Sequence, residues 1–170
     1  MHGALRLSAT RHRELARCGG PVGVEDMPGA LSGQRVLVQR TTENAFNVIV
    51  APSGPYTDMD VSVRFKPIAG PEDVSGGIVF RRAEGQCSVV RVNALEDNFR
   101  LYAYDRGRHQ LATARGQLPA LGQWHTIRVV AVGEPIQAFL NGVLLPGASG
   151  CALWHRPGRP VDESRLHDGL

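Results

Sequence analysis

The sequence is poor in lysine, aromatic residues and cysteine, and it has no long apolar run. Lys66 is the single lysine beside eighteen arginines in 170 residues, and the formal net charge is only +3. The arginines are scattered, with acidic residues between them. Because a nucleic-acid-binding face needs clustered cations, we expect no nucleic-acid partner. No apolar stretch approaches the ~20 residues that span a bilayer, so we expect no membrane partner.

Cysteine is scarce and odd in number, as Cys18, Cys87 and Cys151. Without a Cys-x-x-Cys pair there is no support for a zinc site or redox motif, which leaves either isolated thiols or one disulfide. The histidines lack metal-ligand spacing, and the loop at Glu72-Asp73 is too sparse in carboxylates for calcium. We predict no metal and no cofactor. The N-terminus has charges without a following apolar stretch, so we expect no signal peptide in the chain as written, which fits a cytoplasmic location without fixing it.

Short strand-like segments bounded by glycine and proline are abundant instead. The clearest alternation, Asp60 to Lys66, places Val61, Val63 and Phe65 on one face. Asn141-Gly142 between two apolar runs predicts a hairpin with a type I′ turn. Further strands are expected over 35–39, 46–50, 76–81, 87–93, 99–104, 107–113, 124–132, 136–140 and 143–145.

These segments do not alternate with helices and show no internal repeat. They predict an all-β fold, a two-sheet antiparallel β-sandwich of jelly-roll type, over residues 36–146. Residues 1–35 are broken by glycine and proline, so we expect an irregular segment, with room for one short strand. Residues 147–170 are expected to form an irregular tail with only a weak closing strand.

Segments 76–81, 89–98, 101–102, 124–129 and 141–142 resemble a bacterial family of concanavalin A-like jelly-roll domains. Its members are similar to lectins and glucanases and to 3-keto-disaccharide hydrolase-like domains. The run Arg-x-Asn-Ala-Leu-Glu-Asp-Asn at 91–98 is the most specific part. The resemblance implies two curved antiparallel sheets, with carbohydrate bound on the concave face or at its rim. Cys87-Ser88 occupy the position where the family tends to carry an aromatic pair. The family's closing segment is matched only by a shortened run from residue 157 onward.

Polar and aromatic side chains gather on one face of the central strands. With Val90 and Val92 inward, Arg91 and Asn93 project from the opposite face. Sugars are held by planar polar groups and by aromatic rings, so we expect Arg91, Asn93, Glu96 and Tyr102 to line one open groove. The alternative is that Arg91 pairs with Glu96 or Asp97 to pin a loop while Asn93 and Asn98 cap turns. The candidate ligand-binding residues are Arg81, Arg91, Asn93, Asn98, Tyr102 and Tyr104.

Catalysis has weaker candidates. Glu96 and Asp97 are adjacent and point to opposite faces of an extended chain, which does not supply two carboxyl groups on opposite sides of a glycosidic bond. A 3-keto sugar permits base-assisted elimination with fewer groups, for which Glu96 or His125 is the candidate catalytic base. For His125, the commoner explanation is a partly buried residue with one backbone hydrogen bond.

Three functions fit these patterns. The first is a carbohydrate-recognition module, lectin-like or laminin-G-like, whose partner is a glycan. The second is an enzyme that hydrolyses or cleaves 3-keto-disaccharides or related glycans. The third is a degenerate domain with only a structural or protein-contact role. The sugar and the oligomeric state do not follow from the sequence.

Overall fold

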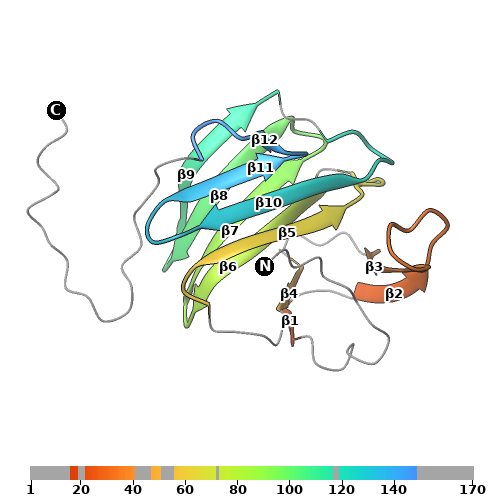
Figure 1. The fold of residues 1–170 in the computed structure, drawn as a ribbon, viewed down its shortest axis with the longest axis horizontal. Coiled ribbons are helices and arrows are strands. Elements are labelled where there is room, and N and C mark those ends of the chain that lie inside the picture. Colours follow the sequence, from red (N-terminus) through yellow and green to blue (C-terminus); the bar gives the residue numbers. More distant parts are fainter. Residues whose placement is uncertain are drawn as a thin grey trace, which may run out of the picture.

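The computed structural model describes residues 16–18, 22–40, 47–50, 56–71, 73–116 and 119–148. Within these residues the chain forms twelve strands and no helix. Two four-stranded antiparallel sheets lie one behind the other (Figure 1). The front sheet has the order β12-β11-β10-β5, and the back sheet has the order β6-β7-β8-β9. The predicted all-β, two-sheet antiparallel sandwich is confirmed.

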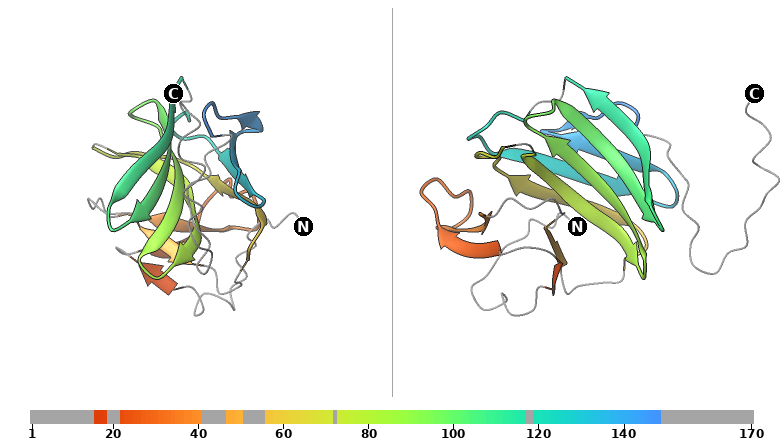
Figure 2. Two further views of the ribbon diagram at one scale, coloured as in Figure 1. Left: turned by 90° about the vertical axis from the view of Figure 1, so that its left-hand side faces the viewer. Right: turned by 180° about the vertical axis from the view of Figure 1, so that it is seen from behind.

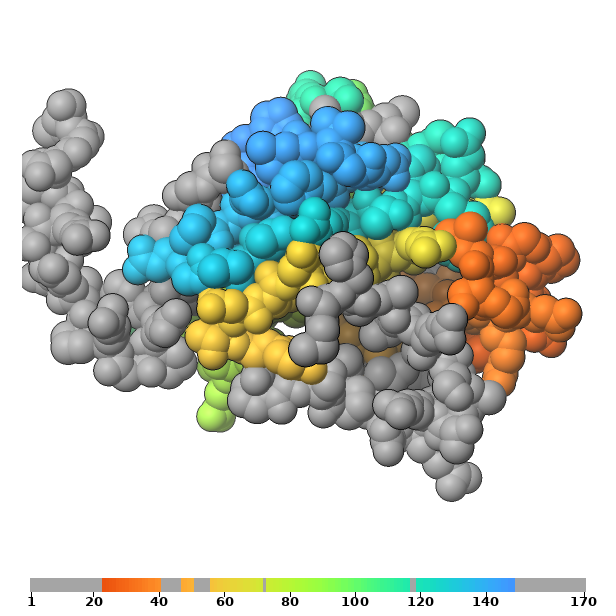
Figure 3. Space-filling model, viewed as in Figure 1, coloured from red at the N-terminus to blue at the C-terminus, as the bar shows by residue number. Residues whose placement is uncertain are grey.

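The strand bounds follow the predicted segments closely. The front sheet consists of β5 (Met59–Phe65), β10 (His125–Ala131), β11 (Ile136–Leu140) and β12 (Val143–Leu144). The back sheet consists of β6 (Ser75–Ala83), β7 (Gln86–Asn93), β8 (Asn98–Asp105) and β9 (Arg108–Arg115). Figure 3 shows the strands of the front sheet packed side by side over one face of the molecule.

The core lies between the inner faces of the two sheets. Val129 of β10 is fully buried opposite Val61 of β5, and Val90 of β7 is fully buried opposite Leu101 of β8. Alternate residues of every long strand join this core because successive side chains point to opposite faces. The fully or almost fully buried apolar residues include Val92, Phe99, Ile127, Ile136, Ala138 and Leu145.

The turn chemistry explains how the hairpins close. Asn141 and Gly142 have φ values of 51° and 84°, which confirms the positive-φ turn predicted from Asn-Gly. The Asn141 side chain adds to this turn, because its Oδ1 accepts a hydrogen bond from Thr126 N at 2.9 Å. In the back sheet, Arg81 has a φ of 50° at an irregularity in the pairing of β6 with β7.

The N-terminal part of the chain differs from the expectation of one short strand. The structure has β1 (Ala16–Cys18) paired with β4 (Val48–Val50), and β2 (Val22–Asp26) paired with β3 (Arg35–Gln39). These pairs lie at the β5–β6 side of the sandwich (Figure 1). The prediction missed β1 because its three residues are too few to show a pattern and its partner is distant in sequence. It missed β2 because Pro21, Gly23 and Pro28 interrupt the apolar pattern there, although β2 pairs with β3, the next strand along the chain. The predicted closing strand lies outside the described residues.

Candidate polar site on the back sheet

The outer face of the back sheet carries the polar cluster expected from the sequence. In the register of the sheet, Arg91 lies between Gly77 of β6 and Arg100 of β8, and Asn93 lies opposite Asn98. One row along the strands, Val89 lies opposite Tyr102. The core residues of these strands occupy the alternate positions, so the sequence-based assignment of the two faces agrees with the structure.

Arg91 is held by two carboxylates on opposite sides of its guanidinium group. Its Nη1 donates to Asp73 Oδ1 at 3.3 Å and to Ser75 Oγ at 2.9 Å, while its Nη2 donates to Glu96 Oε2 at 3.0 Å. Burial works against the charge of Arg91, but hydrogen bonds and charges from Tyr102, Asp73 and Glu96 outweigh it and raise the pKa of Arg91. The guanidinium group is therefore a fixed cation.

Asn93 joins the two loops that flank this cation. Its Nδ2 donates to Asp73 Oδ1 at 2.8 Å, and its Oδ1 accepts hydrogen bonds from Leu95 N at 2.9 Å and Glu96 N at 3.3 Å. An asparagine that bonds the backbone two residues ahead forms a turn in place of backbone pairing. Asn93 thereby shapes the β7–β8 turn and orients Glu96. We call Asp73, Ser75, Arg91, Asn93, Glu96 and Asn98 the Arg91 network.

Glu96 presents its carboxylate at the edge of the Arg91 network. Its Oε2 accepts hydrogen bonds from Arg91 Nη2 and Asn98 Nδ2, both at 3.0 Å, while its Oε1 accepts none from the described residues. Hydrogen bonds from Asn98 and Arg91 hold the pKa of Glu96 below its ordinary value, against the opposing effect of burial. With 42% of its side chain exposed, Glu96 is an ionised, anchored acceptor. It is a poor general base, because an efficient base has a pKa near the working pH.

Two tyrosines extend the site along β8. Arg100 Nη1 donates to the Tyr102 hydroxyl at 3.0 Å, and the Arg108 guanidinium lies 5.3 Å from the centre of the Tyr102 ring. Tyr104 meets Tyr102 edge to face, with ring centroids 6.1 Å apart. Burial opposes ionisation of Tyr102, but hydrogen bonds from Arg100 and Arg91 outweigh it and lower the pKa of the Tyr102 hydroxyl.

The expected open groove is not what the structure shows at the centre of the cluster. Arg91 is 6% exposed, Asn93 is fully buried and Tyr102 is 1% exposed. Arg91 instead pairs with Glu96, and Asn93 bonds the backbone of the β7–β8 turn, as the alternative interpretation of the sequence expected. The surface that a ligand can touch is therefore the rim of the cluster, where Glu96 is exposed and Arg100 and Tyr104 are partly exposed.

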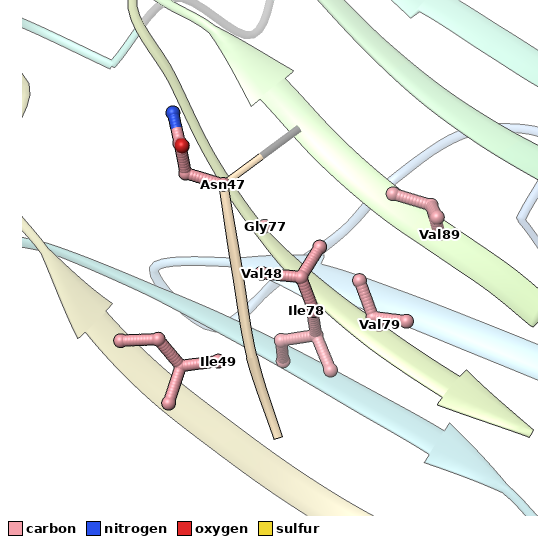
Figure 4. Close-up of a pocket in the computed structure, with 7 residues that line it drawn as sticks. All are labelled: Asn47, Val48, Ile49, Gly77, Ile78, Val79 and Val89. Atoms are coloured by element: carbon pink, nitrogen blue, oxygen red, sulfur yellow. The ribbon is translucent and has the colours of Figure 1, made fainter. Parts of the chain in front are cut away.

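A small cavity lies beside this cluster, between β4 and the edge strand β6 (Figure 4). Its volume is about 130 Å³, below the ~300 Å³ at which ligand sites begin. Its lining is mostly aliphatic, so it does not suit a saccharide. The lining residues are Asn47, Val48, Ile49, Gly77, Ile78, Val79 and Val89.

Two of the residues singled out from the sequence lie apart from the cluster. The Arg81 guanidinium donates to the carbonyl oxygens of Gly133 and Glu134, in the loop between β10 and β11. His125 is on the inner face of the front sheet, 7% exposed, with Phe65 beside its ring.

Both ring nitrogens of His125 have partners. The Nε2 lies 3.0 Å from Ala120 O, and the Nδ1 lies 3.0 Å from Asn141 Nδ2. The Nε2–H therefore donates to the carbonyl, and Nδ1 accepts from the amide. With both nitrogens engaged, His125 is placed as a structural residue, and it does not share a surface with Glu96.

The candidate site residues predicted from the sequence did not include the arginines that surround the tyrosines. Arg100 lies opposite Thr113, Tyr104 lies opposite Arg108, and Asn98 lies opposite Arg115. Arg108 and Arg115 are both exposed. The signal was present, since the hairpin of residues 98–115 contains four arginines and one acidic residue, but the strand pairing was needed to place three of them on one face.

Several other chemical groups are accounted for within the described residues. No group of three histidine, cysteine or acidic residues there is arranged to hold a metal ion. Cys87 is a free thiol whose pKa is raised by burial, with a smaller opposing effect from Arg82. Cys151 and the side chain of Cys18 lie outside the described part. Among the same residues, no helix has the length and apolar character needed to cross a membrane.

The fold has a counterpart among solved structures. The carbohydrate-binding module CBM66 from Bacillus subtilis superimposes with a TM-score of 0.64 at 13% sequence identity, over 81% of this chain and 80% of that one. At this identity the likeness concerns the fold. No protein-family model and no curated protein matches the sequence.

Proposed function

We propose that this chain is a carbohydrate-binding module whose glycan lies on the outer face of the back sheet, along β8 and the β7–β8 turn. The observation that carries the proposal is the preorganised rim of the Arg91 network. There Glu96 is held ionised with Oε1 directed to no described partner and with Arg100 Nη2 4.0 Å from its Oε2, while the partly exposed Tyr104 lies further along β8. The likeness of the fold to a carbohydrate-binding module supports the same function.

The chemistry of the rim suits a sugar. Carboxylate and guanidinium groups bind neighbouring hydroxyl groups through pairs of directional hydrogen bonds, and an aromatic ring packs against the C–H face of a pyranose or furanose. Because Asn93 and Arg91 already fix Glu96, little side-chain entropy is lost on binding. Arg91, Asn93 and Asn98 act as positioning residues in this proposal, while Glu96, Arg100 and Tyr104 make the contacts.

The enzymatic alternative has less support. Base-assisted elimination on a 3-keto-disaccharide needs a base with a raised pKa, whereas the pKa of Glu96 is lowered. His125 faces the core in the other sheet. We therefore assign recognition rather than turnover to this face.

A binding measurement on purified protein tests the proposal. Isothermal titration against a panel of soluble oligosaccharides should find at least one ligand for the wild-type chain. Tyr104→Ala should weaken that affinity about tenfold, the effect of losing one aromatic contact of roughly 1.5 kcal/mol. Arg64 is an exposed arginine on the outer face of the front sheet. The control variant Arg64→Ala should leave the affinity for the saccharide unchanged.

Two results would contradict the proposal. One is the absence of binding to every saccharide in the panel by a protein that circular dichroism shows to be folded. The other is equal affinity for the wild-type chain and Tyr104→Ala. Turnover of a 3-keto-glucoside that disappears in Glu96→Gln would establish the enzymatic alternative instead.

A further inference from the structure

The β8–β9 hairpin carries a local excess of positive charge. Residues 98–115 contain Arg100, Arg106, Arg108 and Arg115 against one acidic residue, Asp105, which gives +3. The complete sequence also has a formal net charge of +3, so the other 152 residues are balanced. The scattered appearance of the arginines in the sequence therefore hides local excesses, of which this hairpin is one.

Strand pairing places three of these arginines on one surface. Arg100, Arg108 and Arg115 occupy outward positions of β8 and β9. We call these three residues the arginine face. Gln110 and Thr113, both exposed, lie between them on the same side of β9. In the view from behind, no described element crosses β8 or β9 (Figure 2).

Two of the three cations of the arginine face, Arg108 and Arg115, form no ion pair with a described acidic residue, and the third, Arg100, has only a long one. Arg100 approaches Glu96 Oε2 only to 4.0 Å, and that oxygen already binds Arg91. Among the described residues, no acidic side chain forms an ion pair with Arg108 or Arg115. By contrast, Arg128 on the outer face of the front sheet is paired with Asp60. The back sheet thus gathers three arginines on one face, whereas on the front sheet Arg128 is paired and the exposed Arg64 stands apart from it on β5.

Two of these guanidinium groups are held in place by Tyr102. Arg100 donates to its hydroxyl group, and Arg108 lies over its ring. A planar guanidinium group that is already oriented binds a carboxylate or sulfate with two parallel hydrogen bonds. The exposed Gln110 and Thr113 add neutral donors and acceptors for hydroxyl groups between the charges.

We propose that the ligand of this face is an acidic glycan, a polysaccharide whose sugar units carry carboxylate or sulfate groups. This inference rests on the proposed function and specifies its ligand class. A neutral sugar would leave Arg108 and Arg115 without anionic partners and Arg100 with only its long contact to Glu96. Nucleic acid fits less well, because proteins that bind duplexes contact about six to ten phosphates, and Tyr102, the central ring, is covered and offers no stacking platform.

Titration calorimetry with four defined probes tests the inference. The probes are oligogalacturonate for carboxylates, heparin oligosaccharide for sulfates, neutral dextran oligosaccharide, and a short DNA duplex. One or both acidic glycans should bind more tightly than dextran, and their affinity should fall as sodium chloride is added, because salt screens exposed charges and competes for them. Which acidic probe binds better distinguishes carboxylate from sulfate.

Matched variants attribute the effect to the arginine face. Arg108→Ala combined with Arg115→Ala should weaken binding of the acidic probe about tenfold or more, with an unchanged melting temperature. Arg64→Ala removes the same charge from the other sheet and should change the affinity less than about twofold. An unaltered affinity in the double variant would overturn the inference.

The remaining outcomes separate this inference from the proposed function. Binding of dextran as tightly as the acidic probes would overturn the acidic ligand class while the glycan-binding function stands. Tighter binding of the DNA duplex than of any glycan would overturn the inference in favour of a phosphate backbone. Failure of all three glycans to bind, with a folded protein, would remove both proposals.

Discussion

Asp73 and Glu96 place their carboxylates on either side of one buried cation, and this arrangement explains the local chemistry of the site. Arg91 is 6% exposed, and a charged group buried to this extent is stable only if its donors are matched by acceptors. Arg91 meets that requirement through both carboxylates and Ser75. The sequence-based alternative of a pinned loop and the ligand-binding proposal are therefore compatible, since the pinned loop is what fixes the exposed carboxylate.

Glu96 makes the stability of the protein depend on acid pH. Its pKa is lower in the folded chain than in the unfolded chain, so its contribution is complete above the unfolded pKa of ~4.3 and disappears as the pH falls through the folded value. Because the side chain is 42% exposed, the contribution is small and screened by solvent. Glu96→Gln should therefore lose less stability than the wild-type chain on acidification below about pH 4.3.

Urea midpoints measured for both proteins from neutral to acid pH check this prediction. The gap between the two midpoints should narrow only in the acid range. A gap that stays constant from pH 7 to about pH 2 would show that Glu96 has the same pKa in both states.

At the scale of the element, β6 depends on two glycines that allow close approach. A Cβ built on Gly77 would lie 2.4 Å from Val90 O in the backbone of β7. A Cβ on Gly76 would lie 2.2 Å from the ring of Phe65, in the facing sheet. The strand therefore has no room for side chains at these positions, and Gly77 is the more constrained because its neighbour is backbone.

Gly77→Ala should lower the free energy of unfolding by about 1–3 kcal/mol, because the backbone of β7 must move to admit the methyl group. Gly107→Ala is the matched control. Its Cβ would come no closer than 3.9 Å to His109 Nε2, so its effect should stay within about 0.5 kcal/mol. Chemical denaturation of both variants checks the difference, and equal effects would contradict the close approach.

At the scale of the whole molecule, the sandwich is more completely closed at its centre than at β5. Ile127, Val129 and Ala131 of β10 are fully buried, whereas their register partners in β5, among them Val61 and Val63, are only partly buried. β5 is the edge strand of its sheet, so its inward side chains have a neighbouring strand on one side only. A valine of β10 should therefore contribute more to the free energy of unfolding than its register partner in β5.

Val129→Ala should destabilise the protein by roughly 2 kcal/mol, because it leaves a cavity in a fully packed site. Val61 is the register partner of Val129. Val61→Ala should lower the free energy of unfolding by about half as much, because folding buries less of the partly exposed Val61 side chain. Paired urea denaturation curves test this. Equal losses would show that the β5 side is packed as tightly as the centre.

The sequence by itself determined the strands of the two four-stranded sheets, the placing of apolar residues on one face of each of these strands, and the turn at Asn141-Gly142. These features depend on the period of two along a strand and on φ preferences, both of which act within a few residues. The grouping of Arg91, Asn93 and Tyr102 on one face was predicted for the same reason.

Only the tertiary structure decided what those side chains do. Asp73 reaches Arg91 and Asn93 from eighteen and twenty residues away, and no local pattern contains that contact. The pairings of β1 and β2, the burial of Tyr102, the separation of His125 and Arg81 from Glu96, and the arginine face all depend on which strands are neighbours. Strand order is set by packing of the complete core. The polar contacts on the outer face of the back sheet therefore could not be predicted from the sequence alone.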